Sequence, residues 1–346
     1  MQLANSLRSI SPKETLERVK PYIKKANITR LANISHLDEM AIPTFSAIRP
    51  LALSLTVSQG KGLTEDEAKV SAYMESIEVY YAENVQADIL NQPYRCNPLF
   101  INPNDLSKQV IYGDNHLFNW CQVESLLSHQ PYYIPIEFLS IDTTDKNVLL
   151  QGSDTTGLAS GNNRKEALIH SFFECIERLN IKNNPISVII DINHSTYQLL
   201  AKNHHIKLFY YENSLAIPTF GCFFQSNNCQ DNQIIFSGYG CHFDKNIALN
   251  RAITEAIQAK LTLISGTRDD IDRFTYQTNA QTLPQSNKSI CFSQLKDQKF
   301  KTINALYYQL IEILNANDLD LLVYSYHQQA LCILKSILIQ RDVLAL

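Results

Sequence analysis

The sequence lacks the features that mark several common classes of protein. Its 346 residues include 30 lysines and arginines against 34 acidic residues, so no excess positive charge indicates a nucleic-acid-binding surface. The eight cysteines form no Cys-x-x-Cys pair, and we expect reduced, mostly packed thiols. No apolar run approaches the roughly 18 residues of a membrane span, and residues 1–10 lack the pattern of a secretory signal. A cytoplasmic protein is therefore predicted.

What remains is an ordinary globular composition, with 45% hydrophobic and 18% charged residues. The length allows two lobes or more, at about 150 residues per domain. We expect an N-terminal helix and strands over 1–56, leading into a main domain over 57–346 that contains a polar, mobile loop at 271–293. Predicted strands and helices alternate irregularly, which favours an α+β architecture over a regular parallel sheet.

Capping residues and hydrophobic periodicity define the expected elements. Ser11, Pro12 and Glu14 form a helix start with a capping box, and the spacing of Thr64 to Glu67 indicates another. Residues 84–128 have a weak pattern interrupted by prolines, and 155–162 reads as a loop of small residues. We predict helices at 12–26, 64–83, 163–180, 196–203, 247–265 and 301–316, and strands at 47–59, 132–141, 147–150, 187–192, 206–211, 219–225, 234–240, 321–326 and 330–339.

Three of these helices are apolar except for a stripe of polar residues spaced i, i+4, i+7, which falls within a sector of roughly 60°. Such a stripe predicts carboxylates that face inward, where an unpaired charge costs several kcal/mol or more. For any one helix, a solvated polar face is an equally good interpretation, but three such helices make coincidence a poor explanation. The stripes are Ser71, Glu75 and Glu78; His170, Glu174 and Glu177; and Arg251, Glu255 and Gln258.

Carboxylates from several helices form a hard-oxygen site that suits Mg²⁺ better than Zn²⁺. Arg178 and Arg251 lie beside these acids and can bind phosphate oxygens, and Lys61 lies in a glycine-flanked turn before a helix. No G-x-x-x-x-G-K-[ST] motif is present, so the pattern indicates a nucleotide site built without a P-loop. Simpler interpretations stay open: a plain turn at Lys61, a core role for His170, and a local salt-bridged turn at 268–270.

At these residues the sequence resembles the YcaO family over about residues 10–270. The resemblance is carried by the three stripes together with the glycine-rich segments that precede two of them. Further motifs resemble the branch of the family that works with TfuA partners. The motifs shared with the whole family, besides the stripes, are Gly60-Lys61-Gly62, 157–162 with Glu166, and Glu174-x-x-Glu177-Arg178. The motifs that resemble the TfuA-associated branch are Ser11-Pro12-x-Glu14-Thr15, Ile42-Pro43, Arg49-Pro50, Ser58-Gln59, Gly240-Cys241-His242 and Gly266-x-Arg268-Asp269-Asp270.

The resemblance implies a YcaO-type fold, with mixed and antiparallel sheets packed with helices around a nucleotide cleft. It also implies ATP and Mg²⁺ as cofactors and a reaction that phosphorylates a backbone amide of a peptide or protein. An external sulfide equivalent would give a thioamide, whereas a neighbouring Cys, Ser or Thr side chain would give an azoline ring in a ribosomally made peptide. The implied partners are the peptide substrate, a TfuA-like protein, a sulfur donor and a second copy of the chain.

Carried over by position, the resemblance assigns roles to the stripes and their surroundings, but it assigns no catalytic residue. Val79 stands where many members carry Arg or His, and Ala159 stands where some relatives carry a nucleotide-contacting Ser. These departures keep a non-catalytic nucleotide- or peptide-binding scaffold as a third hypothesis. The C-terminus lacks the proline-rich tail of azoline-forming members, so thioamide formation ranks first and azoline formation second. Nucleotide contacts are expected at Lys61, Ser71, Asn162, Arg178 and Arg251, and metal ligands at Glu75, Glu78, Glu166, Glu174, Glu177 and Glu255.

Overall fold

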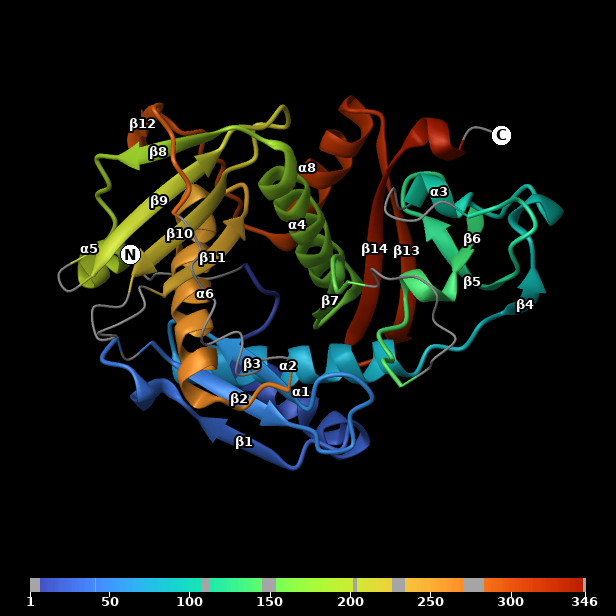
Figure 1. Ribbon diagram of the computed structural model, residues 1–346, viewed down its shortest axis with the longest axis horizontal. Helices are drawn as coiled ribbons and strands as arrows, with labels where there is room; N and C mark the ends of the chain where they lie inside the picture. The colour runs from blue at the N-terminus through green and yellow to red at the C-terminus, as the bar shows by residue number, and fades with distance from the viewer. Residues whose placement is uncertain are drawn as a thin grey trace. The chain divides into compact units, whose positions relative to one another are not determined.

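The computed structural model describes residues 7–40, 42–106, 112–144, 154–201, 204–225, 234–269 and 283–344. The chain folds into two compact units that alternate along the sequence (Figure 1). Because the units interleave, they do not test the predicted boundary at residue 56, which stays a prediction. Unit 1 comprises Met1–Pro50, Leu55–Ser76 and Ile176–Lys301, and unit 2 comprises Leu51–Ser54, Ile77–Cys175 and Thr302–Leu346.

Unit 1 begins with a helix and a small sheet. Helix α1 (Pro12–Lys25) starts at the predicted capping box, in which the Ser11 hydroxyl accepts from the Glu14 backbone N–H and the Glu14 carboxylate accepts from the Ser11 backbone N–H. An antiparallel sheet with the order β1-β2-β3 follows. Its strands span β1 (Arg30–Asn33), β2 (Thr44–Ile48) and β3 (Val57–Lys61), and Arg49-Pro50 separates β2 from β3.

A five-stranded sheet with the order β11-β10-β9-β8-β12 forms the rest of unit 1. Its pairings are antiparallel except that of β12 with β8, which is parallel. The alternation of large apolar residues along these strands allowed most of them to be predicted to within one or two residues. They span β8 (Ile186–Ile190), β9 (His205–Tyr211), β10 (Thr219–Gln225), β11 (Ile235–Cys241) and β12 (Ser289–Cys291), and α5 (Ser195–Ala201) lies between β8 and β9.

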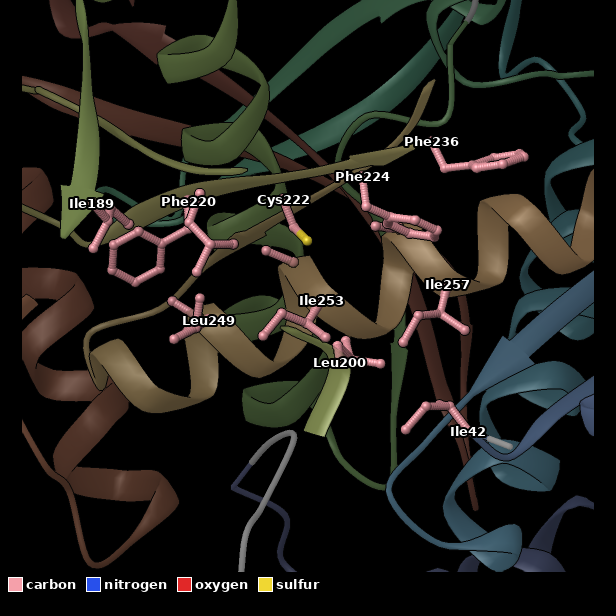
Figure 2. Packing of buried hydrophobic residues seen from close by; sticks show 14 of the residues in the cluster. Ile42, Ile189, Leu200, Phe220, Cys222, Phe224, Phe236, Leu249, Ile253 and Ile257 are labelled. Carbon is pink, nitrogen blue, oxygen red and sulfur yellow. The ribbon is translucent and has the colours of Figure 1, made fainter. Parts of the chain in front are cut away.

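Helix α6 (Lys245–Ser265) packs on this sheet and forms the main core of unit 1 (Figure 2). Leu249, Ile253 and Ile257 of the helix lie in one cluster with Phe220, Cys222 and Phe224 of β10, and Leu200 and Ile42 belong to the same cluster. The helix ends at Gly266, whose φ of 58° is the left-handed conformation that favours glycine at this position. A buried ion pair, Lys260 Nζ to Asp38 Oδ1 at 2.7 Å, ties its last turns to the N-terminal segment.

Unit 2 is built on a six-stranded antiparallel sheet with the order β4-β5-β13-β14-β7, in which β6 also pairs with β5. Trp120 of β5 is fully buried, and its ring stacks on Phe100 at 4.1 Å. The strands span β4 (Ile89–Gln92), β5 (Phe118–Ser125), β6 (Pro131–Pro135), β7 (Leu158–Gly161), β13 (Leu319–Gln328) and β14 (Cys332–Gln340); the helices are α3 (Pro103–Leu106) and α8 (Ile303–Ala316).

Two helices contribute to both units. Helix α2 (Glu65–Glu83) belongs to unit 1 up to Ser76 and to unit 2 from Ile77, and α4 (Arg164–Asn183) belongs to unit 2 up to Cys175 and to unit 1 from Ile176. With α6, these are the three helices predicted to carry polar stripes. The α+β class, the antiparallel sheets and all three striped helices are therefore confirmed.

Several predicted elements are wrong. Segment 84–128 is not irregular, because β4, α3 and β5 lie within it, and the small-residue segment 155–162 contains strand β7. The strand expected at 132–141 ends at Pro135, where a 3-10 turn begins. The strand expected at 147–150 and most of the loop expected at 271–293 lie outside the described residues, and that loop's last part forms β12.

None of the described helices combines the length and the apolar character that a bilayer crossing requires. The described cysteines are free, and most of them are buried, as expected for packed thiols.

The close packing of β11 on α6 predicts a strong effect of one methyl group. A Cβ added at Gly240 would lie 2.1 Å from the Ala248 carbonyl oxygen and 2.7 Å from the Ala252 nitrogen, and neither backbone atom can move aside cheaply. Gly240→Ala should destabilise the protein by about 1–3 kcal/mol, measured as a lower Tm in thermal unfolding. Gly113→Ala is the control, because no atom lies within 4 Å of its added Cβ. Equal Tm values for both variants would contradict this packing.

Candidate functional site

The three striped helices are each the second half of one βα repeat. The pairs are β3 with α2, β7 with α4, and β11 with α6, and matching residues are separated by 99 positions (75 to 174) and then 81 positions (174 to 255). Under these offsets the helices begin at matching residues. The residue before each helix also matches, and its side chain accepts from a backbone N–H in the first turn, namely Thr64 from Glu67, Asn163 from Glu166, and Asp244 from Ile247.

Small residues hold each strand against the helix that follows it. A Cβ at Gly60 would collide with the backbone of Ala68 and Ala72, and the matching Gly240 would collide with the matching Ala248 and Ala252. In the second repeat Ala159 takes the place of this glycine, and Gly161 packs against Ala167 as the matching Gly62 packs against Ala68. The end of each strand therefore lies at a fixed height beside its helix, which fixes where the striped residues lie relative to the strand.

Unit 1 brings together one acid from each of the three helices, beside a lysine. Lys61, the last residue of β3, places its Nζ 2.9 Å from Glu255 Oε2 of α6. The backbone N–H of Tyr239 donates to the other oxygen of Glu255 at 3.3 Å, and the backbone of Gln59 makes the matching hydrogen bond to Glu75. Lys61 thus ends a strand shortly before a helix, as the plain-turn interpretation expects, and it also forms an ion pair with an acid of the third repeat.

Burial dominates the electrostatics of Glu75. It raises the pKa of this carboxyl group to about 7, although Lys61 and Arg268 act in the opposite direction and Glu255 acts in the same direction. A solvated helix face would leave the pKa near its ordinary value of 4.5. The solvated-face interpretation therefore fails for this residue.

Glu177 and Glu255 influence each other across the same cluster. Burial and the Glu255 charge raise the pKa of Glu177 to about 7, against the effects of Arg251 and Arg178. Burial also acts to raise the pKa of Glu255, but the ion pair with Lys61 and the nearby Arg178 bring it below its ordinary value. One acid is thus neutralised by a lysine, while the other two are left with incomplete compensation.

Arginines surround this cluster at different depths. Arg251 is half-buried and Arg178 is exposed, so Arg178 can turn toward a ligand while remaining hydrated. Burial and the Arg251 charge lower the pKa of His242 to about 3, so this imidazole is neutral, and its Nδ1 accepts from the Asp244 backbone N–H at 2.9 Å. The cations therefore lie beside the acids, as a phosphate-bearing ligand would require.

Four further predicted residues, Glu78, Asn162, Glu166 and Glu174, lie in unit 2. The Ser160 hydroxyl of β7 donates a short hydrogen bond to Glu78 Oε1. Glu166 Oε2 accepts from both the backbone and the side-chain nitrogen of Asn162, at 2.9 and 3.0 Å, and all of these groups are buried. Glu174 lies near the buried ammonium of Lys335 and raises its pKa against the larger, lowering effect of burial.

The donor set fits a magnesium ion held together with a triphosphate. Within the described ranges, no three His, Cys, Asp or Glu side chains are grouped closely enough to hold a metal ion by themselves. Mg²⁺ usually takes only one or two protein carboxylates and fills its octahedral shell with phosphate oxygens and water. The raised pKa values of Glu75 and Glu177 show that added positive charge would be favourable here.

The predicted residues thus separate into two groups, one in each unit. Lys61, Glu75, Glu177, Arg178, Arg251 and Glu255 interact in unit 1, Ser71 lies half-buried on the α2 stripe of the same unit, and Glu78, Asn162, Glu166 and Glu174 lie in unit 2. Their individual roles as ligands stay predictions.

Three residues near these groups received no site role from the sequence. Arg268 acts on Glu75, and Asp269 accepts from the backbone and hydroxyl of Thr56 at 2.9 and 2.6 Å, so this segment is not only a local salt-bridged turn. Ser160 was grouped with a loop, because its strand is short and rich in small residues. The sequence did contain one signal for Ser160, because it stands 99 residues after Lys61, at the matching position of the second repeat.

The two raised pKa values predict a pH-dependent gain in stability on substitution. A carboxyl group whose pKa rises from 4.5 to about 7 on folding stabilises the protein below the lower value, and this contribution is lost as the pH rises through the higher one. Without Mg²⁺ or nucleotide, Glu75→Gln and Glu177→Gln should raise the Tm by a few degrees at pH 8 and by little at pH 5. Glu65→Gln, at an exposed site on α2, is the control. A gain of the same size at both pH values would contradict burial of these acids.

Comparison with known proteins places this geometry in a family. An uncharacterized protein of Mycobacterium tuberculosis is 32% identical over 78% of this chain, and the match covers 65% of that protein's length. An uncharacterized protein in the tfuA 3′ region of Rhizobium leguminosarum bv. trifolii is 28% identical over 78% of this chain and 70% of its own. The chain therefore spans only about two thirds of these relatives.

Solved structures share the fold at low sequence identity. A heterocyclase in complex with substrate and cofactor has a TM-score of 0.79 and 20% identity, covering 96% of this chain and 52% of its own. YcaO from Methanopyrus kandleri, bound with AMPPCP and Mg²⁺, has a TM-score of 0.75 and 17% identity, covering 97% and 92%. The family model for YcaO cyclodehydratases, described as binding ATP and Mg²⁺, matches residues 59–335. ATP and Mg²⁺, the cofactors expected from the sequence, are therefore those of the family, and the chain belongs to the YcaO family.

Proposed function

We propose that this protein activates a backbone amide of a peptide or protein by phosphorylation with ATP, for thioamide formation with a TfuA-type partner. The observation that carries the proposal is the cluster of Glu75, Glu177 and Glu255. These acids come from three helices, and burial leaves two of them short of positive charge. A Mg²⁺–ATP complex would supply that charge and would also bring the phosphoryl group to be transferred.

The residues of this cluster divide the work that phosphoryl transfer requires. Lys61 and the two arginines, Arg178 and Arg251, would bind phosphate oxygens and neutralise the negative charge that spreads over them in the transition state. The acids would hold Mg²⁺ against the triphosphate. In unit 2, Glu78, Glu166 and Glu174 are proposed as further metal ligands, and Asn162 as a nucleotide contact; Ser71 of unit 1 is a second such contact.

The proposed reaction balances through loss of phosphate. A sulfide equivalent adds to the amide carbon, and the amide oxygen takes the γ-phosphoryl group while ADP leaves. Release of inorganic phosphate then forms the carbon–sulfur double bond. Phosphorylation converts a poor leaving oxygen into a good one, which is why ATP is consumed.

Azoline formation is the second candidate, because it requires the same activation and differs only in the nucleophile. The structural likeness to a heterocyclase supports it. The relative in a tfuA 3′ region supports thioamide formation instead. The proposed partners are a peptide substrate, a TfuA-like protein, a sulfur donor and a second copy of the chain. The proposed location is the cytoplasm.

Nucleotide binding tests the acid cluster directly. In calorimetric titrations with ATP and Mg²⁺, the wild-type protein should bind, and Glu75→Ala and Glu177→Ala should each lose about tenfold or more in affinity. Glu65→Ala is the matched control, because Glu65 lies on the same helix as Glu75 but is 62% exposed and pairs with Lys69 at the surface. Unchanged affinity in both cluster variants would contradict the site.

The product distinguishes the two candidate reactions. The chain would be expressed with a TfuA-like protein and with peptides encoded near its gene, and the peptides analysed by mass spectrometry. We expect replacement of one oxygen by one sulfur in a peptide, dependent on the TfuA-like protein. Loss of one water without sulfur gain would instead identify an azoline-forming enzyme.

A further inference from the structure

The three βα repeats share one more position, which is the last residue of β3 and β11 and the second-last residue of β7. Lys61, Ser160 and Cys241 are equivalent under the same offsets of 99 and 81 residues. They differ in chemistry, being a cation, a hydroxyl group and a thiol. All three precede the striped helix of their own repeat by the same number of residues.

Each of these matching residues interacts with a striped acid of a different repeat. Lys61 of the first repeat pairs with Glu255 of the third, and Ser160 of the second donates to Glu78 of the first. Cys241 of the third lies within electrostatic reach of Glu177 of the second. Lys61 and Ser160 therefore contact an acid of another repeat directly, whereas the Cys241 thiol only lies near one.

Ser160 is held in a fixed position beside Glu78. It is 3% exposed, and its strand is fixed on one side by register with β14, where Ile333 is its partner. On the other side, Gly161 packs against the first turn of α4. Ala159 points to the opposite face of the strand, so Ser160 does not replace the serine that some relatives carry there.

We propose that Ser160 is a positioning residue that orients the carboxylate of Glu78 for binding a divalent cation. The inference rests on the proposed function, because it takes Glu78 as a metal ligand. A hydrogen bond from a buried hydroxyl group selects one rotamer of a flexible glutamate, so less conformational freedom is lost when the cation binds. Partners of this kind orient metal ligands, and their removal costs about 10- to 100-fold in metal affinity.

A double-mutant cycle tests the proposal through metal binding rather than activity. Mn²⁺ would be titrated in the presence of AMPPCP and followed by electron paramagnetic resonance, for wild type, Ser160→Ala, Glu78→Gln and the double variant. Ser160→Ala should weaken Mn²⁺ binding by about tenfold. Because Ser160 acts through Glu78, the double variant should bind Mn²⁺ no more weakly than Glu78→Gln alone.

Two further variants separate positioning from folding. Ser336→Ala is the matched control, because Ser336 is a buried serine of the adjacent strand β14 whose hydroxyl finds no hydrogen-bond partner among the described residues. It should leave Mn²⁺ affinity unchanged. Ser160→Thr keeps the hydroxyl group, so its Mn²⁺ affinity should lie within about twofold of wild type. Loss of a charge-assisted hydrogen bond would cause a larger change. If Ser160→Ala does not fold, Ser160→Cys takes its place, with an intermediate loss expected.

The outcomes distinguish this inference from the proposed function. Wild-type affinity in Ser160→Ala, or additive losses in the double variant, would overturn the positioning role while leaving the proposed function intact. Failure of the wild-type protein to bind Mn²⁺ with AMPPCP would overturn the proposed function itself.

Discussion

The site depends on carboxylates that are held where water cannot fully hydrate their negative charge. Burying an ionised carboxylate costs several kcal/mol unless a cation or hydrogen bonds offset it. In unit 1, Lys61 offsets Glu255, while Glu75 and Glu177 retain pKa values of about 7. A protein selected only for stability would not keep both acids in this state. Their position is understandable if a divalent cation and a triphosphate complete the site when they bind.

The fold meets this requirement by repeating one construction. In each βα repeat, a strand ends beside the first turns of the next helix, and glycine or alanine allows the two backbones to approach closely. Each stripe position of the first helix therefore has a matching position in the second and third helices, at the same number of residues from the glycine or alanine of the preceding strand. The precision that metal and phosphate binding needs thus comes from backbone packing, and the striped residues are free to differ: Glu78, Glu177 and Gln258 occupy the same position in the three repeats.

The sequence predicted the features that arise from local periodicity. The three stripes, the capping residues and four strands of the five-stranded sheet follow from side-chain patterns within a few residues. The same patterns indicated six acids, and the grouping of Glu75, Glu177 and Glu255 among them came from the structure. The sequence did not predict β7, since Leu158-Ala159-Ser160-Gly161 contains little of the branched or aromatic character of a strand, and its pairing with β14 depends on residues far along the chain. Contacts between distant segments, such as Ser160 with Glu78 and Asp269 with Thr56, have no local signal.

Proton release on ligand binding tests the central claim most directly. At pH 7, acids with pKa values of about 7 are partly protonated, so a bound cation must displace protons from them. Calorimetric titration of the protein with Mg²⁺–AMPPCP, repeated in buffers of different ionisation enthalpy, measures that release. We predict net proton release by the wild-type protein, reduced when Glu75 and Glu177 are both changed to glutamine. Heats that do not depend on the buffer would contradict the claim that buried, incompletely compensated carboxylates receive the metal–nucleotide complex.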